Sequence, residues 1–286
     1  VEWQENQMRA LRLVSNLIVA TVLAVNLLAS GATAAEETKV DAFLNVTGFD
    51  VSLDSIRLSA KSAPMMLGMD SDDFGYQWTL IADDVFASEG MREMALDMLS
   101  QALSDDLLEH AADFYASELG ERLVKVENAS HLSDDDEFKS ESGEAIIDGL
   151  IRIGSPRVEL LKRMNAASDA AGTSIRAIQE IQVRFLLAAA GAGVIELRLE
   201  EADLREMMRN DEPELRLSLQ ASGLAGAAYT YQAFSDAEVE EYTVALENYK
   251  MQKVYDIMNA VQFSIMADRF EELAVRMATL QPSEDL

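Results

Sequence analysis

The amino-acid sequence predicts an all-α protein, a helical bundle made of two related helical modules that follow a cleaved signal peptide. Composition is the first reason: the 286 residues include four prolines and fourteen glycines, while Ala, Leu, Glu and Met, which favour helices, are plentiful. Periodicity is the second reason, because apolar residues after residue 36 recur at the spacing of an amphipathic helix. With 49% apolar residues, the chain is able to bury a sizeable core.

The periodic stretches set the expected helices in chain order. Two short ones come first, and longer ones follow a loop at 68–77 that is rich in Asp and Gly. The expected helices lie at 38–47, 52–67, 80–100, 105–128, 145–152, 156–168, 172–190, 192–210, 213–231 and 236–279.

The N-terminal segment has the features of a secretory signal peptide. Arg9 and Arg12 form a basic head, an apolar stretch occupies 13–29, and Ala-Thr-Ala at 32–34 is a small-x-small cleavage site. The competing interpretation is an uncleaved anchor, but a membrane span needs about 20 apolar residues, and this stretch is shorter. The segment is therefore excluded from the expected fold.

We expect cleavage after Ala34 or Ala35, a periplasmic or secreted mature protein, and no membrane span after cleavage. The polar, acidic stretch that follows His131 is the best candidate for a linker between modules, although it also contains a sequence able to start a helix. The expected division is an upstream extension with the signal peptide at 1–35, a first helical module at 36–130, an acidic linker at 131–144 and a second helical module at 145–286.

A short phrase occurs twice in the chain. Gln-Ala-Leu-Ser-Asp at 101–105 returns as Gln-Ala-Phe-Ser-Asp at 232–236, shifted by 131 residues. At this shift residues 101–129 pair with 232–260 without a gap, and seven positions are identical, the last two being Asn-Ala. We expect an internal duplication; the alternative is convergence of two acidic amphipathic helices.

The repeated phrase has the residues of a helix start. Ser104 and Ser235 are placed to accept hydrogen bonds from the free amides of the first turn, and aspartates follow where the helix dipole favours anions. Glu238 completes a capping box in the second copy, whereas Leu107 does not in the first. Both serines are therefore predicted to begin helices that occupy equivalent places.

The stretch Phe-Tyr-Ala-Ser-Glu-Leu-Gly-Glu-Arg-Leu at 114–123 resembles the F-Y-x-S-x-x-G-x-x-L signature of domain of unknown function 2059. This is a family of small helical modules in exported bacterial proteins. The resemblance is clearest at 80–130, with a weaker echo at 210–275, and Glu118 stands where the family often has proline. It implies a helical fold and an exported protein, and it implies no particular activity.

Four residues of this stretch form the candidate binding surface: Phe114, Tyr115, Ser117 and Gly120. Glycine inside a helix costs about 1 kcal/mol relative to alanine, so Gly120 requires a reason. One reason is close approach of another helix; the other is a groove beside Gly120 that is filled in the second copy. The second copy has Ala245, Leu246, Asn248 and Met251 at the four equivalent positions.

Composition also excludes several classes of function. A formal net charge of −28 repels nucleic-acid phosphates, so no nucleic-acid partner is expected. The absence of cysteine removes thiolate metal sites and cysteine nucleophiles, and two histidines, His110 and His131, are too few for a histidine-rich metal site. We expect no catalytic, cofactor-binding or metal-binding residues.

Two patterns imitate metal sites. Asp-Ser-Asp-Asp-Phe-Gly at 70–75 resembles the start of a calcium loop, but Phe74 takes a ligand position and Ile81 stands where a glutamate is needed. Met91, Met94 and Met98 lie on one helix face and could offer thioethers to Cu(I), but methionine at helical spacing usually packs in a core. We therefore expect an acidic loop and buried methionines.

These observations favour a non-catalytic interaction or scaffolding protein with an unknown protein partner. The alternative is a protein that binds a small apolar or lipid-like ligand between its helices, and a metal-free hydrolase is the third hypothesis.

Overall fold

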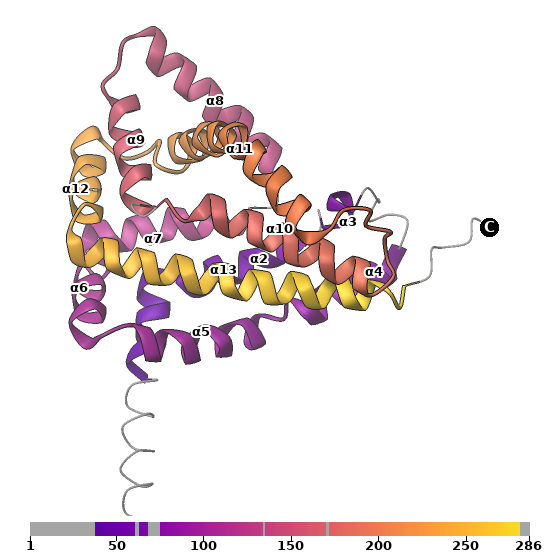
Figure 1. Cartoon of the computed structure of the whole chain (residues 1–286). Coiled ribbons are helices and arrows are strands. Elements are labelled where there is room, and N and C mark those ends of the chain that lie inside the picture. Colours follow the sequence, from indigo (N-terminus) through magenta and orange to yellow (C-terminus); the bar gives the residue numbers. More distant parts are fainter. Residues whose placement is uncertain (1–37, 61–62, 68–74, 134, 170–171, 281–286) are drawn as a thin grey trace, which may run out of the picture.

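The computed structural model describes residues 38–60, 63–67, 75–133, 135–169 and 172–280, and within these ranges the chain forms helices and connecting turns without a β-strand (Figure 1). The all-α prediction is confirmed. The predicted signal peptide and nearly all of the acidic tract at 70–75 lie outside the described residues. In the described part of the chain, no helix has the length and apolar character needed to span a membrane.

The first half of the chain begins with a helix over 38–47. The helices that follow it are α2 (Phe49–Ala60), α3 (Ala63–Met66), α4 (Gly75–Val85), α5 (Ser88–Ala102), α6 (Asp105–Tyr115) and α7 (Glu118–His131). The second half contains α8 (Asp136–Arg152), α9 (Arg157–Ser168), α10 (Ser174–Gly191), α11 (Glu201–Thr230), α12 (Asp236–Leu246) and α13 (Tyr249–Met277).

Helix α13 runs through the middle of the molecule, with α10 beside it and α6 and α12 near its N-terminal end (Figure 1). It packs against α2, α4, α5, α6, α9, α10 and α12. The buried core is continuous and draws residues from both halves of the chain. The two halves are therefore packed together on one shared core.

The predicted acidic linker is largely helical. Helix α7 ends at His131 and α8 begins at Asp136, whose preceding residue Asp135 caps it by accepting a hydrogen bond from the Phe138 amide at 3.0 Å. The acidic residues that suggested a linker thus serve as the N-terminal turn of a helix, where the dipole favours negative charge.

Two helices that the periodicity predicted as continuous are broken. The predicted helix 105–128 ends at Tyr115 and restarts after Ser117, whose hydroxyl accepts from the Gly120 amide at 3.1 Å. The predicted helix 236–279 breaks at the equivalent place, where the Asn248 side chain accepts from the Lys250 amide at 2.9 Å. At each break a new helix begins with a side-chain cap, and the spacing of apolar residues continues from one helix to the next.

The repeated segments have matching boundaries. Helices α6 and α12 coincide over their whole length when shifted by 131 residues (105 to 236, 115 to 246), and α7 and α13 then begin at equivalent residues. Leu103 and Phe234, which precede the two caps, are both buried. These matches support the predicted duplication, and the prediction that both serines precede helix starts is confirmed.

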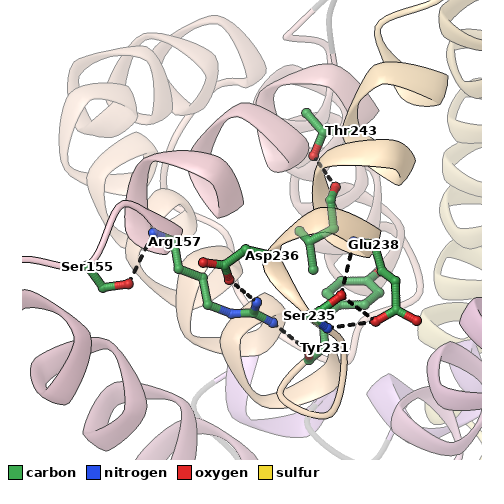
Figure 2. Close-up of polar contacts among 8 residues, drawn as sticks. Ser155, Arg157, Tyr231, Ser235, Asp236, Glu238 and Thr243 are labelled. Carbon is green, nitrogen blue, oxygen red and sulfur yellow. Dashed lines mark hydrogen bonds and ion pairs between the residues drawn. The ribbon is translucent and has the colours of Figure 1, made fainter.

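The two caps differ in their bonds. Ser235 accepts from the Glu238 amide at 3.3 Å, and Glu238 accepts from the Ser235 amide at 2.7 Å, which is the predicted capping box (Figure 2). The Ser104 side chain accepts no hydrogen bond from an amide of the first turn, and its hydroxyl donates to the Asp106 carboxylate at 2.5 Å. The prediction of a side-chain cap at Ser104 is therefore wrong.

The first aspartate of each repeated helix is held by a cation from an earlier helix. Arg157, at the start of α9, donates to Asp236 at 2.5 Å and to the Tyr231 carbonyl at 2.7 Å, so it lies across the start of α12 (Figure 2). Lys39 donates to Asp105 at 2.6 Å in the first half. The helix over 38–47 and α9 thus make corresponding contacts with α6 and α12.

The methionine stripe of α5 is only partly buried. Met91 is fully buried together with Ala95 and Leu99, whereas Met94 and Met98 are half-buried at the edge of the core. The buried positions of α5 recur every four residues from Met91, which leaves Met94 and Met98 beside that face. The prediction that Met94 and Met98 are enclosed is therefore wrong. Replacing either by alanine would leave a smaller cavity than at a fully buried site.

The different caps predict different costs for the same substitution. Ser235→Ala should lower the free energy of unfolding by about 1 kcal/mol, because it removes a cap and half of a capping box. Ser104→Ala serves as the matched control and should cost less, since no amide is lost. Urea denaturation followed by circular dichroism measures both, and equal losses would contradict the assigned hydrogen bonds.

Candidate functional site

The four residues of the predicted binding surface lie close together at the turn between α6 and α7, but they do not share one exposed face. Tyr115 and Gly120 are buried, Phe114 is half-buried, and Ser117 is exposed and caps α7. Phe114 stacks on Tyr242 of α12, with ring centroids 5.8 Å apart and planes 8° apart. Tyr115 therefore belongs to the interior, where it meets the second half of the chain.

Gly120 is required by a close approach of the backbone. A Cβ at this position would lie 2.3 Å from the Phe114 carbonyl oxygen and 2.6 Å from the Tyr115 Cα. The neighbour is the last turn of α6, which folds back onto α7. No room remains for a groove at this glycine, and Met251, the equivalent residue of α13, is fully buried in the core.

The Tyr115 hydroxyl leads to a polar cluster between the two repeated segments. It lies 2.5 Å from the hydroxyl of Tyr255 and 3.3 Å from that of Tyr242, and the latter two are 3.0 Å apart. Nearby, the Tyr231 hydroxyl donates to the Glu127 carboxylate at 2.6 Å. These five side chains come from α6, α7, α12, α13 and the turn after α11, and we call them the tyrosine–glutamate cluster.

The cluster favours neutral forms of its members. Burial raises the pKa of the Glu127 carboxyl, while the hydroxyls of Tyr231 and Tyr242 oppose that rise. Burial also raises the pKa of Tyr115, Tyr231 and Tyr242 well above the usual range, and the nearby Glu127 carboxylate adds to each rise. The tyrosines are therefore protonated hydrogen-bond donors at physiological pH, and Glu127 is the group able to change its charge.

Glu127 and Tyr255 reach the wall of a cavity of about 290 Å³ where the two halves meet. Its wall is built from the turn at 47–49, α2, α7, the end of α9, the start of α10 and α13. The wall contains both polar and apolar side chains: Thr47, Gly48, Phe49, Ser52, Glu127, Asn128, His131, Ser168, Asp169, Ser174, Tyr255, Met258, Asn259, Gln262 and Phe263.

The wall of the cavity contains an asparagine from each of the two similar segments. Asn128 and Asn259 are equivalent at the shift of 131, and both line the cavity from α7 and α13. Asn259 donates to the carbonyl of Ser168, the last residue of α9, at 3.0 Å. Asn128 lies against Gly48, where an added Cβ would be 2.4 Å from its Oδ1. Each asparagine thus meets the end of the helix that precedes α2 or α10.

Several polar side chains in the wall have no hydrogen-bond partner within the described protein. Among the described residues, the side chains of Ser52, Asn128, His131 and Gln262 make no hydrogen bond or ion pair within the protein. Asp169, by contrast, accepts from the Thr173 amide at 3.0 Å and from the Ser174 hydroxyl. Polar side chains without protein partners that face one cavity are available to bind a ligand.

A second and larger cavity, of about 850 Å³, lies between α9, the start of α10 and α11. Ser168, Asp169 and Ser174 line both cavities, so this junction separates them. Apolar side chains from α10 and α11, including Ile175, Leu219 and Leu224, form part of its wall.

Of the predicted surface residues, Tyr115 alone belongs to the tyrosine–glutamate cluster. The periodicity of α7, α12 and α13 gave no reason to select Glu127, Tyr242 or Tyr255, since each has the spacing of an ordinary helical residue. The identical asparagines at 128 and 259 were the signal in the sequence that pointed to this cavity.

The family model for "Uncharacterized protein conserved in bacteria (DUF2059)" matches residues 89–148. The matched part runs from α5 through α6 and α7 into α8, and it contains the signature stretch 114–123, so the resemblance is confirmed. It includes the α7 wall of the smaller cavity, with Glu127, Asn128 and His131, and ends before α9. Searches of curated proteins and of solved structures found no match.

The close approach at Gly120 predicts that even alanine is harmful there. Gly120→Ala should lower the free energy of unfolding by more than about 1 kcal/mol, because a methyl group would press on the backbone of Phe114 and Tyr115. Gly149→Ala is the matched control in α8, where an added Cβ meets nothing within 4 Å and should stabilise the helix by up to about 1 kcal/mol. Thermal melts of both variants measure the contrast, and an unchanged melting temperature for Gly120→Ala would contradict the packing described.

Proposed function

We propose that this is a non-catalytic exported protein that binds a small ligand between its helices, in the cavity where α7 meets α13. The observation that carries the proposal is a pocket, partly open to solvent, whose wall holds polar side chains without protein partners among the described residues. Ligand sites in proteins usually measure about 300–1,000 Å³, so a cavity of about 290 Å³ suits a small molecule. Its wall combines polar side chains with apolar and aromatic ones, which suits a small molecule that has both polar and apolar groups.

The hydrogen bonds of the cavity support a binding role over catalysis. Ser168 and Ser174 donate to the Asn165 carbonyl and to Asp169, so neither hydroxyl is paired with His131 as a nucleophile would be with its base. The tyrosine hydroxyls are bonded to one another or to Glu127. Export is supported by the signal-peptide features of 8–35.

A cavity-filling variant tests the proposal. Native mass spectrometry of protein purified from the exported fraction of its host should show a small molecule bound to the wild type. Ser52→Leu should abolish that species, because the side chain would enter the cavity from α2. Ser100→Leu on α5, which is not part of the wall, should retain it. A ligand that survives Ser52→Leu, or a wild type that carries none, would count against this site.

A second candidate function, a protein-interaction module, is favoured by exposed apolar side chains at one end of the α8–α11 pair. Gly143 of α8 meets the Ala225 backbone of α11, and Phe138 meets Tyr229 with ring centroids 6.1 Å apart. These two contacts set an antiparallel register that brings Ile151 level with Leu217. Ile151 is 60% exposed, Leu217 69%, and the neighbouring Ile153 76%.

This candidate predicts a loss of partner binding without a loss of stability. Changing Ile151 and Leu217 together to serine should abolish a cross-linked partner in the exported fraction, because an apolar patch at an interface would be removed. The melting temperature should change little, since both side chains are exposed. Val244→Ser, at an exposed site 55% accessible on α12, is the control and should leave cross-linking intact. Equal cross-linking in all three proteins would exclude this patch.

A further inference from the structure

We infer that the ligand of the smaller cavity is a small organic cation, an amine or quaternary ammonium compound, held by the Glu127 carboxylate. The inference rests on the proposed binding function and adds the chemical class of the ligand. It follows from the charges in the wall, from the aromatic side chains there, and from the way Glu127 is held.

The formal charges of the wall are of one sign. Glu127 and Asp169 are its acidic residues, and neither lysine nor arginine is among the fifteen residues that line it. An anionic ligand would meet two carboxylates without a cation to balance it, whereas a cation is attracted by both. The protein as a whole carries a formal charge of −28, which raises the local concentration of cations near its surface.

Aromatic faces supply the second part of a cation site. Phe49 from α2 and Phe263 and Tyr255 from α13 line the same cavity as Glu127. Cations bind favourably over aromatic rings within about 6 Å, and quaternary ammonium groups are commonly recognised by such rings together with a carboxylate. The amide oxygens of Asn128 and Gln262 are free to accept hydrogen bonds from an N–H of an amine.

Glu127 is positioned as the anchor. One of its oxygens, Oε1, accepts from Tyr231 at 2.6 Å, which fixes the carboxylate at the cavity wall. The other carboxylate, Asp169, already accepts from Thr173 and Ser174 and therefore contributes mainly its field. A cation that reaches Glu127 would offset the loss of hydration that burial imposes on its carboxylate.

The tyrosines around Glu127, and His131 on the same helix, carry no charge near neutral pH. The tyrosines of the cluster, from α6, α12, α13 and the turn after α11, are neutral because burial raises their pKa. On α7, desolvation and the nearby Lys139 lower the pKa of His131, so its ring is neutral too. Lys139 itself is bound to the carbonyls of Ser130 and Ser133 and pairs with Asp136.

The raised pKa of Glu127 gives cation binding a defined pH dependence. As pH falls through this pKa the carboxyl takes up a proton, and a cation then binds only by displacing that proton. Affinity for a permanently charged cation such as choline should therefore decrease on acidification and reach its plateau at alkaline pH. Near the pKa, binding should release protons into the buffer.

Isothermal titration calorimetry of the full chain at about 0.15 M salt, where long-range surface attraction is screened, tests the inference. The probes are choline and putrescine, with glucose as the neutral control and succinate as the anionic control. We expect choline or putrescine to bind and both controls not to bind. Glu127→Gln, which retains an oxygen for Tyr231, should weaken binding about tenfold or more. Gln262→Glu should tighten it by adding a carboxylate to the wall.

The outcomes separate the two proposals. Binding of glucose or succinate that Ser52→Leu abolishes, with no binding of either cation, would retain the cavity as a ligand site and overturn the assignment of a cation. Cation binding that neither Ser52→Leu nor Glu127→Gln alters would also overturn it, because the site would then lie elsewhere. If Glu127→Gln fails to fold by circular dichroism, the Gln262→Glu variant and the pH dependence decide. No binding of any probe, together with no ligand in native mass spectrometry, would contradict both proposals.

Discussion

The burial of α13 is the constraint on which the rest of the structure depends. Helices α2, α4, α5, α6, α9, α10 and α12 all pack against it in the described part of the chain, and its buried residues extend from Met251 to Met277. A helix with apolar residues on more than one side is stable only when neighbours cover those sides, so the halves of the chain must meet around it. Arg184 of α10 adds ion pairs to Asp268 at 2.7 Å and to Glu271 at 2.5 Å along the half-exposed edge of this helix.

The segments α6–α7 and α12–α13 have matching helix boundaries, but they make different contacts at equivalent positions. The first segment has glycine where the α6 backbone meets α7, whereas Met251 occupies the equivalent position of the second and is fully buried. Arg122 of α7 links the two segments by pairing with Glu238 at 2.6 Å and lying 4.9 Å from the centre of the Phe234 ring. Matching helix boundaries therefore accompany an asymmetric interior.

That asymmetry produces the polar cluster. At a shift of 131 residues, Tyr115 of α6 corresponds to Leu246 of α12. Tyr242 of α12 and Tyr255 of α13 correspond to Ala111 of α6 and Val124 of α7. Buried hydroxyls are costly unless they are hydrogen-bonded, and here they satisfy one another across the junction. The same network keeps Glu127 at the wall of the smaller cavity, where burial makes its charge costly without a partner. A bound cation, as we propose, would supply that partner.

The helical class, the helix starts after Ser104 and Ser235 and the capping box at Ser235 could be predicted from the sequence, because these features depend on local chemistry. Helix propensity, capping and apolar period involve residues within about one or two turns of one another, and they hold whatever the chain packs against. The breaks at Ser117 and Asn248 were within reach of the same reasoning, since both are cap residues at equivalent positions, but the unbroken apolar period concealed them.

The meeting of Tyr115 with Tyr242 and Tyr255, the backbone contact that requires Gly120, and the cavity between Asn128 and Asn259 were decided by the tertiary structure. These residues come from helices as far apart in the chain as α6 and α13. Only the packing around α13 brings Tyr115 within hydrogen-bonding distance of Tyr242 and Tyr255 and places Asn128 and Asn259 in one wall, and a periodic pattern does not contain that information.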